Sequence, residues 1–574
     1  MDKRIFLAII LSVGVIALTQ VIFPPVQPPA GADSTLAAPG SPADPASTAA
    51  STTTQQPASP EQPLGVPSSV SGDPAAADSQ LSIPVVRAET SVVDTPVSTW
   101  TMSSLGAAPV AVEMDAFRSL RNGARATDQP PVQIVRQGEP LLTYAVAVPG
   151  DTVDFARVPF SVRESAGADG SPVIEYSAVR EGITLAIRYA FVPDSYLVRV
   201  STSASGAPAR SFLLVGLPRG LASAESDTLG DQQHLAYAYK PRANGASSIG
   251  FGKLDPGERR LVNGPHSWVA AKSKYFIVGL LTPDDGEPFA EFSMVGGPRE
   301  VGSERATNAS GTALMSLSGD GANFELYAGP QEWRRMVALG RDFKDSNPYG
   351  GFMQPIVQPF ATIVMNVLLW MRGTMNISYG WVLVIFGVLV RLVMWPLNQK
   401  AMRAQLRMQR IQPELQAAQK KYAKDPQKQQ QEIMRVYKEH GMSPFSTLSG
   451  CLPMLLPMPI FFALFFVFQN TIEFRGVPFL WLEDISLKDP YYILPLLMGA
   501  TTFLVSWIGM RGMKEVPQQQ KMIMYVIPVT FTFVLLNMAA GLNLYYAVQN
   551  LAALPQQWLI ARERRKAAGV TVKG

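Results

Sequence analysis

Long stretches without charged residues alternate with polar segments along this chain of 574 residues. Six stretches approach the roughly 20 residues that a helix needs to cross a membrane. They are residues 5–23, 379–397, 451–469, 491–510, 522–538 and 542–560. The pattern therefore predicts a polytopic α-helical membrane protein with six transmembrane helices.

The first stretch follows Lys3 and Arg4, as in a signal peptide, but its 19 apolar or neutral residues exceed the usual apolar region of such a peptide. We expect residues 1–23 to be an uncleaved N-terminal anchor, with a cleaved signal as the alternative. Residues 24–96 are dominated by Pro, Ala, Ser and Thr, which cannot bury enough apolar surface to offset the entropy of ordering. This segment is expected to be a disordered linker.

From residue 97 to residue 345 the apolar positions recur with period two, as in half-buried β-strands. Apolar residues alternate with others over 183–189, Asp194 lies in a turn, and the alternation resumes over 196–200, which predicts a hairpin. Gly, Pro, Asp and Asn clusters separate the strand-like runs, as in an all-β sandwich. Two further runs are residues 275–281 and 324–327.

Residues 352–371 carry no charge, but Pro355 and Pro359 disrupt the first half as a helix. The remaining 360–371 would be about 18 Å long, too short for a hydrocarbon core of roughly 30 Å. Residues 346–378 are therefore expected to form an interfacial amphipathic helix on the outer leaflet.

Basic residues assign the sides of the membrane, because Lys and Arg concentrate in cytoplasmic loops. The loop 398–450 carries ten basic and four acidic residues, and its helical periodicity predicts a cytoplasmic helical hairpin that ends at Gly441. The tail 561–574 is also basic, whereas the loop 470–490 within the helical region 451–560 is acidic overall. Both termini are thus expected in the cytoplasm and the β domain in a periplasm.

Composition excludes several other functions. A net charge of +4 is too small to indicate DNA binding, and a single cysteine, Cys451, excludes a disulfide framework or a cysteine-based metal site. The sequence has no phosphate-binding loop. No cofactor and no metal are expected.

Arg391 is the most informative residue, because it lies six residues, or about 9 Å of helix, inside the apolar run 379–397. A charge at the centre of a membrane helix costs about 2.5 to 3.5 kcal/mol, and such residues usually face a water-filled cavity. The alternative is that the side chain extends to the membrane surface.

Polar side chains in the later helices are candidates to line such a cavity. The predicted transmembrane helices from residue 379 onward contain no Asp, Glu or His to pair with Arg391. This absence disfavours a proton relay and favours a role in attracting an acidic ligand. Helix-to-helix hydrogen bonding is the alternative role of the polar residues. The candidates are Thr501, Thr502, Ser506, Thr530, Thr532, Asn543, Gln549, Asn550 and Gln556.

The third apolar stretch combines Pro453, Pro457 and Pro459 with many Met and Phe residues. Prolines interrupt regular backbone pairing, and Met with Phe makes an adaptable apolar surface. A kinked packing helix is the alternative.

Several short motifs in the same order resemble the YidC family of bacterial membrane protein insertases. The resemblance is dense from about residue 380 to residue 560 and looser across the β domain. The matching positions are Met1-Asp2-Lys3-Arg4, Val390-Arg391, Met394, Pro396-Leu397, Gly450-Cys451, Pro453, Met458-Pro459-Ile460-Phe461, Ala463-Leu464, Asp489-Pro490-Tyr491-Tyr492-Ile493-Leu494-Pro495, Met498-Gly499, Gly541-Leu542 and Leu544-Tyr545-Tyr546.

The resemblance implies a protein that inserts newly made membrane proteins and helps them fold, alone or beside the Sec translocon. It implies a five-helix core with a cytoplasm-open hydrophilic groove around Arg391, an apolar slide made by the third and fifth helices, and a periplasmic β-supersandwich. Nascent membrane proteins, membrane lipids and, weakly, the ribosome are the implied partners, in the bacterial inner membrane. The implied substrate-binding residues are Arg391, Met458, Phe461, Thr530, Val534 and Tyr546.

This chain departs from the family pattern at Gly387, where members often have a hydroxyl, and at Pro457, where they often have Gln. The groove is expected to be less polar here. Extra residues at 446–449 are expected to reshape the loop before the third helix.

Two other function classes compete with insertion. A small-solute transporter or channel would need inverted repeats and a paired ionisable site, and the sequence shows neither. A membrane-anchored carbohydrate-active enzyme would rest on the isolated His234 and His266. We therefore expect an insertase without enzymatic activity.

Overall fold

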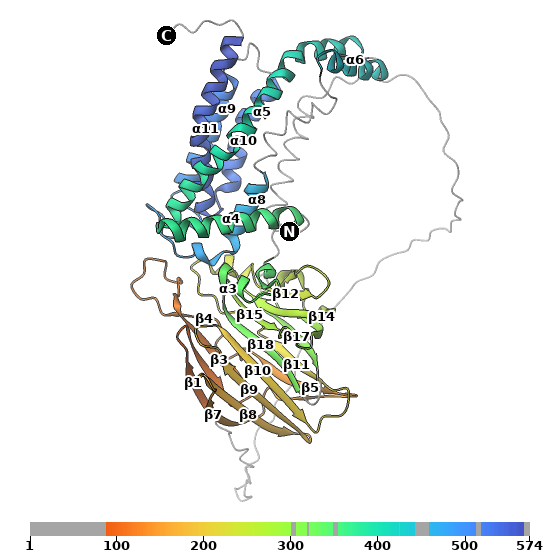
Figure 1. The fold of residues 1–574 in the computed structure, drawn as a ribbon, viewed down its shortest axis with the longest axis vertical. Coiled ribbons are helices and arrows are strands. Elements are labelled where there is room, and N and C mark those ends of the chain that lie inside the picture. The colour runs from red at the N-terminus through yellow and green to blue at the C-terminus, as the bar shows by residue number, and fades with distance from the viewer. Residues whose placement is uncertain are drawn as a thin grey trace, which may run out of the picture. The chain divides into compact units, whose positions relative to one another are not determined.

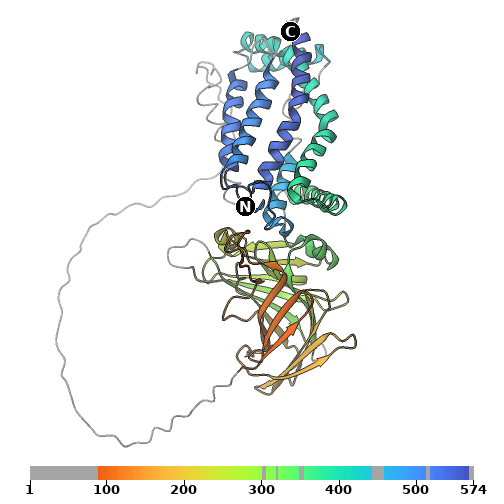
Figure 2. The ribbon, with the colours of Figure 1, turned by 90° about the vertical axis from the view of Figure 1, so that its left-hand side faces the viewer.

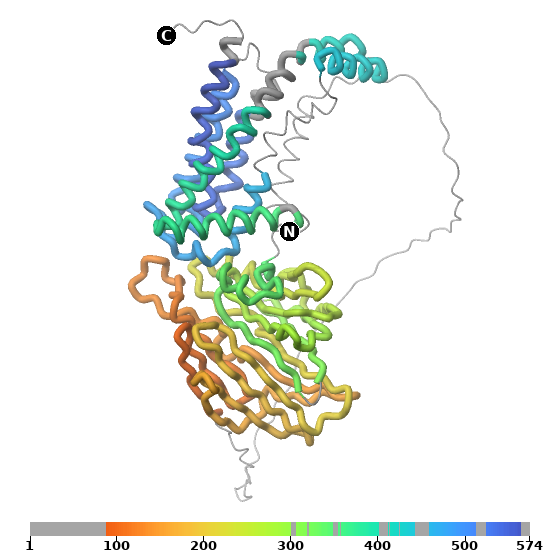
Figure 3. The backbone as a smooth tube through the Cα atoms, viewed as in Figure 1, coloured from red at the N-terminus to blue at the C-terminus, as the bar shows by residue number. Residues whose placement is uncertain are grey.

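The computed structural model describes residues 88–299, 306–317, 321–347, 354–423, 425–441, 458–511 and 518–567. The expected N-terminal anchor, nearly all of the expected linker, and residues 442–457 with Cys451, Pro453 and Pro457 lie outside them. The described chain comprises a β domain up to Pro330 followed by a helical part (Figures 1 and 3).

The described residues of the β domain form two antiparallel sheets. A four-stranded sheet has the order β1-β2-β3-β4, and a 14-stranded sheet has the path β6-β5-β11-β17-β16-β14-β15-β18-β10-β9-β8-β7, with β12 joined to β14 and β13 to β12. The strands are β1 (Thr90–Asp94), β2 (Ser98–Ser103), β3 (Ala108–Arg118), β4 (Pro131–Gln133), β5 (Thr143–Val148), β6 (Asp151–Asp154), β7 (Ser161–Ala166), β8 (Pro172–Arg180), β9 (Ile183–Phe191), β10 (Leu197–Ser205), β11 (Phe212–Leu217), β12 (Ala236–Pro241), β13 (Ser247–Gly250), β14 (Arg259–Lys272), β15 (Phe276–Leu281), β16 (Phe289–Gly296), β17 (Ala309–Ser316) and β18 (Gly321–Pro330).

The predicted hairpin is confirmed as β9 and β10, which pair antiparallel with Val200 opposite Tyr189. Alternate residues of β9 are buried, because successive side chains of a strand point to opposite faces of the sheet. Asp194 adopts a positive φ of 55° in the connecting turn, a conformation that Asp tolerates better than most residues. The two further predicted runs are confirmed as β15 and part of β18.

Strand structure begins earlier than the sequence predicts. The expected linker reaches residue 96, but β1 occupies Thr90–Asp94 and pairs with β2. Its Val93 is buried in the core of the domain. Two adjacent valines suffice for one edge strand when a partner strand supplies the hydrogen bonds, which composition alone does not show.

Short helices connect the strands to the helical part. These are α2 (Thr228–Gln232) and α3 (Trp333–Ala338), together with 3₁₀ turns at Phe251–Lys253 and Phe343–Ser346. The longer helices are α4 (Gln354–Met375), α5 (Tyr379–Lys421), α6 (Pro426–Glu439), α8 (Met458–Asn470), α9 (Ile493–Met510), α10 (Gln518–Leu535) and α11 (Ala540–Ala567), with a 3₁₀ turn at Ile472–Phe474.

Three helix boundaries differ from the sequence predictions. Helix α4 spans Gln354–Met375 and contains both Pro355 and Pro359, so the half that these prolines were expected to disrupt is helical from Gln354 onward. Helix α5 continues through the expected boundary at residue 397 into the segment expected as a helical hairpin. Helix α11 extends to Ala567, into the segment expected as a basic tail.

The helical hairpin predicted for residues 398–450 is present as the distal part of α5 and α6. Ile411 and Leu415 of α5 pack with Val436 and Tyr437 of α6. Asp425 caps α6 by accepting a hydrogen bond from the N–H of Lys428 at 3.1 Å, and Gly441 follows the helix with a φ of 63°.

Helix α11 packs against both α9 and α5, and α9 packs against α10 (Figure 2). Within the described residues, Tyr379–Lys400 and Ile493–Met510 are long and apolar enough to cross a membrane, and Met458–Asn470 and Met524–Leu535 are shorter apolar helices. The predicted count of six transmembrane helices is therefore not established by the described helices.

Candidate functional site

Arg391 of α5 is fixed by a glutamine on the neighbouring helix α11. Its Nη2 donates a hydrogen bond of 2.7 Å to Oε1 of Gln556, and Nε2 of Gln556 donates at 3.1 Å to the carbonyl oxygen of Trp395. The Gln556 side chain is almost completely buried. One amide thus uses its acceptor on Arg391 and its donor on the backbone of α5, one turn further along.

The charge of Arg391 is not neutralised by any hydrogen-bonded carboxylate in the described part of the chain. Its Nε is buried and has no hydrogen-bond partner among the described residues. Its neighbours Leu392 and Val393 are 61% and 66% exposed, as expected of a face that meets lipid. Arg391 is therefore a cation held by neutral groups inside an apolar helix, which suits transient attraction of an acidic group.

Two of the polar candidates on α9, Thr501 and Thr502, form hydrogen bonds with α11. Nδ2 of Asn550 donates to Oγ1 of Thr502 at 2.8 Å and to Oγ1 of Thr501 at 3.3 Å. Both threonines also donate to the carbonyl oxygen of Met498. These three side chains join α9 to α11 by hydrogen bonds, which is the alternative to lining a cavity that the sequence analysis left open.

The other polar candidates are spread over α9, α10 and α11. Nε2 of Gln549 donates to the Tyr545 hydroxyl at 3.1 Å, and Nδ2 of Asn543 donates to the Leu535 carbonyl at 3.1 Å. Thr532 donates to the carbonyl of Pro528 within its own helix. Ser506 and Thr530 are partly exposed.

An aromatic cluster joins the expected slide helices. The Phe461 ring of α8 lies 5.3 Å from the Tyr546 ring of α11 and 6.0 Å from the Phe531 ring of α10, between ring centroids. Met458 begins α8 and Val534 lies on α10, and both are partly exposed. The structure thus brings Phe461 of α8 and Tyr546 of α11 together.

Gly387 lies where α5 approaches α11 closely. A Cβ atom added there would lie 3.2 Å from Cγ1 of Val548 and 3.4 Å from the Tyr545 carbonyl oxygen. A side chain at this position would press against α11, so the absence of a side chain at Gly387 allows close packing of the two helices. Pro457 lies outside the described residues.

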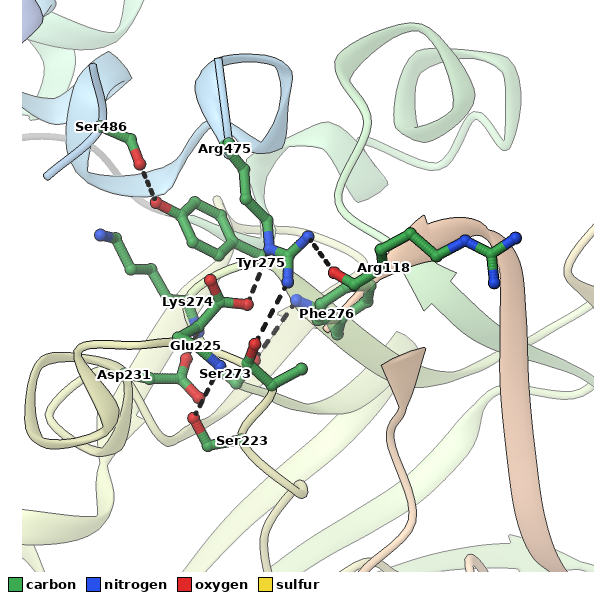
Figure 4. Close-up of polar contacts among 12 residues, drawn as sticks. Arg118, Ser223, Glu225, Asp231, Ser273, Lys274, Tyr275, Phe276, Arg475 and Ser486 are labelled. Carbon is green, nitrogen blue, oxygen red and sulfur yellow. Dashed lines mark hydrogen bonds and ion pairs between the residues drawn. The ribbon is translucent and has the colours of Figure 1, made fainter. Parts of the chain in front are cut away.

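The sequence prediction missed a contact between the loop that follows α8 and the β domain. Arg475 in this loop forms a buried ion pair with Glu225 at 2.7 Å (Figure 4). The loop was assigned only by its charge balance. A signal was present in Ile472-Glu473-Phe474-Arg475, where charged and bulky apolar residues alternate in a segment too short to be a strand of its own.

The two histidines of the β domain do not form a common site. Nδ1 of His234 contacts the carbonyl of Gly230 at 2.8 Å, whereas His266 is buried on β14 with Nε2 at 3.1 Å from the Val262 carbonyl. Burial lowers the pKa of His266. Among the described residues, no group of three or more His, Cys, Asp or Glu is placed to hold a metal ion.

Comparison with known families covers both parts of the chain. The family described as 60Kd inner membrane protein matches residues 370–567, and the YidC periplasmic domain matches residues 90–363. The insertase YidC of Azotobacter vinelandii is 30% identical over 412 residues, covering 70% of this chain and 71% of that protein. The chain belongs to the YidC family of membrane protein insertases. The resemblance carried by the sequence motifs is thereby confirmed.

Other YidC proteins align over different extents. The YidC of Anaeromyxobacter dehalogenans strain 2CP-C is 31% identical, but the match spans only 56% of this chain and 57% of that relative. The YidC of Syntrophus aciditrophicus is 26% identical over 98% of this chain and 100% of its own length.

Among solved structures, an active YidC insertase is similar over 82% of this chain and 93% of its own, with 18% identity and a TM-score of 0.32. A galactose mutarotase-like protein from Lactobacillus casei covers 42% of this chain and 100% of its own, with 10% identity and a TM-score of 0.30.

Proposed function

We propose that this YidC-family chain inserts newly synthesised inner-membrane proteins and helps them fold, alone or with the Sec translocon. The observation that carries the proposal is Arg391, a cation inside an apolar helix that is bound by the neutral Gln556. Family membership supports insertion, and it gives no support to the alternative of a small-solute transporter or channel.

The proposed topology has six transmembrane helices with both termini in the cytoplasm and the β domain in the periplasm. The apolar helices 379–400 and 493–510 support this arrangement, as do the basic residues of the hairpin of α5 and α6. In this topology the hairpin and the C-terminal end of α11 face the ribosome and acidic lipids, to which their basic residues would bind weakly.

The proposed mechanism lowers the cost of moving a polar tail across the membrane. Water in a groove that opens to the cytoplasm would hydrate the tail, and Arg391 would attract its acidic residues. The adjoining substrate helix would meanwhile contact the apolar cluster of Phe461 and Tyr546. Burial of about 20 apolar residues in lipid, and the membrane potential at about 2.3 kcal/mol per charge per 100 mV, would drive insertion. No covalent step is required, so we propose no enzymatic activity.

The test compares two substrates that differ only in the charge of the translocated tail. In cells depleted of their own insertase, Arg391→Ala should insert the acidic-tail substrate several-fold less well than wild type and the neutral-tail substrate nearly as well. Arg391→Lys, which keeps the charge, is the matched control and should retain most of the acidic-tail activity. Equal insertion of both substrates by Arg391→Ala would contradict the role of Arg391.

A further inference from the structure

The turn that follows α8 contributes residues to two hydrophobic cores, that of the β domain and that of the main group of helices. Ile472 belongs to the core of the β domain, whereas Phe474, two residues later, belongs to the core of the helical part. In the opposite direction, Trp333 of α3, directly after the last strand of the β domain, packs in the helical core. A residue of the helical part, Ile472, therefore packs in the core of the β domain, and the helix that leaves the β domain begins with a residue of the helical core.

Polar contacts hold this exchange in place. Oε1 of Glu473, between Ile472 and Phe474, accepts a hydrogen bond of 2.8 Å from the backbone N–H of Trp333. The Trp333 indole Nε1 donates at 3.0 Å to Oδ1 of Asn366 on α4. The turn after α8, helix α3 and helix α4 are thereby connected through one tryptophan.

Arg475 makes the second attachment, one residue beyond Phe474 (Figure 4). Its Nε lies 2.7 Å from Oε1 of Glu225, and its Nη1 donates at 3.0 Å to the carbonyl of Arg118. The two paired side chains are only 4% and 8% exposed. Because the Arg475 guanidinium also lies over the Phe276 ring at 5.7 Å, it is enclosed by the β domain.

A third contact comes from the return of the same loop. The Tyr275 hydroxyl donates to Oγ of Ser486 at 3.0 Å, and the Tyr275 ring lies beside the Arg475 guanidinium (Figure 4). Asp484 fixes the loop by accepting hydrogen bonds from the N–H groups of Gly476 and Ser486. The loop is thus internally ordered and attached to the β domain along both of its arms.

The attachment begins directly at the end of α8. Helix α8 ends at Asn470, and the buried Thr471 donates its N–H to the carbonyl of Val467, which continues the helical pattern into the turn. Phe461 lies nine residues before Asn470 on the same helix, or about 14 Å at 1.5 Å per residue. A change in the direction of the anchored end would therefore move Phe461 relative to Tyr546.

We propose that Glu473 and Arg475 are positioning residues, which clamp the outer end of α8 to the β domain and so set the place of Phe461 for contact with a substrate helix. The role in substrate contact rests on the proposed insertase function. The clamp itself rests only on the contacts of the loop.

The experiment measures docking and substrate contact separately in the full-length protein. In a Cys451→Ala background, spin labels at the exposed Glu181 and Leu480 report the distance between the β domain and the loop in proteoliposomes. A photocrosslinking amino acid at Phe461 reports contact with a ribosome-bound nascent membrane protein.

Arg475→Met should broaden the distance distribution and lower crosslinking from Phe461 several-fold, because Glu225 is left buried without its partner. The double variant Arg475→Met with Glu225→Met removes both charges and should recover most of both signals, which also shows that loss of folding is not the cause. The matched control is Arg188→Met, which breaks the exposed pair with Glu175 in the same domain and should change neither signal.

If Arg475→Met broadens the distance distribution but leaves crosslinking from Phe461 unchanged, the positioning of α8 is overturned. If Arg475→Met leaves the distance distribution unchanged, the clamp is overturned. A wild-type protein that is docked but gives no crosslink and no insertion would contradict the proposed function while leaving the clamp intact.

Discussion

Gln556 accepts a hydrogen bond from Arg391 and donates one to the carbonyl of Trp395, so that a single amide bridges two positions of α5 from α11. Because the amide is neutral, it directs the guanidinium without cancelling its charge. The orientation of Arg391 and its availability to an acidic substrate therefore depend on the same partner.

Replacing Gln556 by Glu should convert this neutral partner into a counter-ion. The carboxylate would form an ion pair with Arg391, which becomes strong away from water, and would compete with acidic residues of the substrate. Insertion of an acidic-tail substrate should fall several-fold, nearly as far as in Arg391→Ala, while a neutral-tail substrate inserts nearly as well as with wild type. Insertion in proteoliposomes measures both.

Gln549→Glu supplies the control, because it adds the same charge to the same helix at a residue bonded to Tyr545. It should leave the preference between the two tails closer to that of wild type. If Gln549→Glu and Gln556→Glu alter the preference between acidic and neutral tails equally, the added negative charge alone causes the effect. The prediction of a specific ion pair with Arg391 is then wrong.

Asn550 is expected to matter for stability more than for substrate choice. Asn550→Leu removes its hydrogen bonds to Thr501 and Thr502 between α9 and α11. Hydrogen bonds between membrane helices contribute about 0.6 kcal/mol on average, so unfolding in detergent should become easier by about 1 kcal/mol. The ratio of acidic-tail to neutral-tail insertion should stay near that of wild type. A large change in that ratio would show instead that Asn550 takes part in substrate contact.

The helical core shows what a sequence can and cannot predict. The position of Arg391 and the apolar stretches follow from composition and periodicity, and the motifs give the family. The bond between Arg391 and Gln556 joins residues 165 positions apart, and a pattern along one helix contains no information about the rotation of another. For the same reason the sequence left open whether Thr501, Thr502 and Asn550 line a cavity or join helices.

The β domain was predictable as alternating strands, whereas its attachment to the helical part was not. Arg475 and Glu225 are 250 positions apart, and each alone resembles an ordinary surface charge. Their burial depends on tertiary packing of Ile472 into the β domain. Only the bulky residues beside the charges indicated that the loop is more than a solvated connection.

Gly387 should tolerate a small side chain and reject a branched one. Gly387→Ser places its Cβ 3.2 Å from Cγ1 of Val548, a contact that a shift of a few tenths of an ångström relieves. Gly387→Val adds two methyl groups at the same interface, and overpacking of this kind typically costs about 1–3 kcal/mol. Thermal unfolding should place the serine variant near wild type and the valine variant well below it; equal stability of the two would contradict the close packing of α5 and α11.

Glu473 should make the stability of the protein depend on pH in a specific direction. Burial, together with the nearby Glu332, raises the pKa of its carboxyl to about 7 against the opposing effects of the Trp333 N–H and Arg334. Burial also raises the pKa of Glu225 to about 7, in spite of Arg475. Both carboxyls therefore bind a proton more tightly in the folded protein than in the unfolded chain.

Because the pKa of Glu473 is higher in the folded than in the unfolded state, its protonated carboxyl contributes to the free energy of unfolding. This contribution is complete below about pH 4.5 and is lost as the pH rises through about 7. For Glu473 the difference between 4.5 and about 7 corresponds to roughly 3 kcal/mol, at about 1.4 kcal/mol per pKa unit. Glu473→Gln still offers an oxygen to the N–H of Trp333 but cannot ionise. Thermal unfolding of the purified protein from pH 5 to pH 8 should therefore show a shallower loss of stability in Glu473→Gln than in wild type, with the remaining slope due partly to Glu225. Identical slopes would contradict the burial of the Glu473 carboxyl in the folded protein.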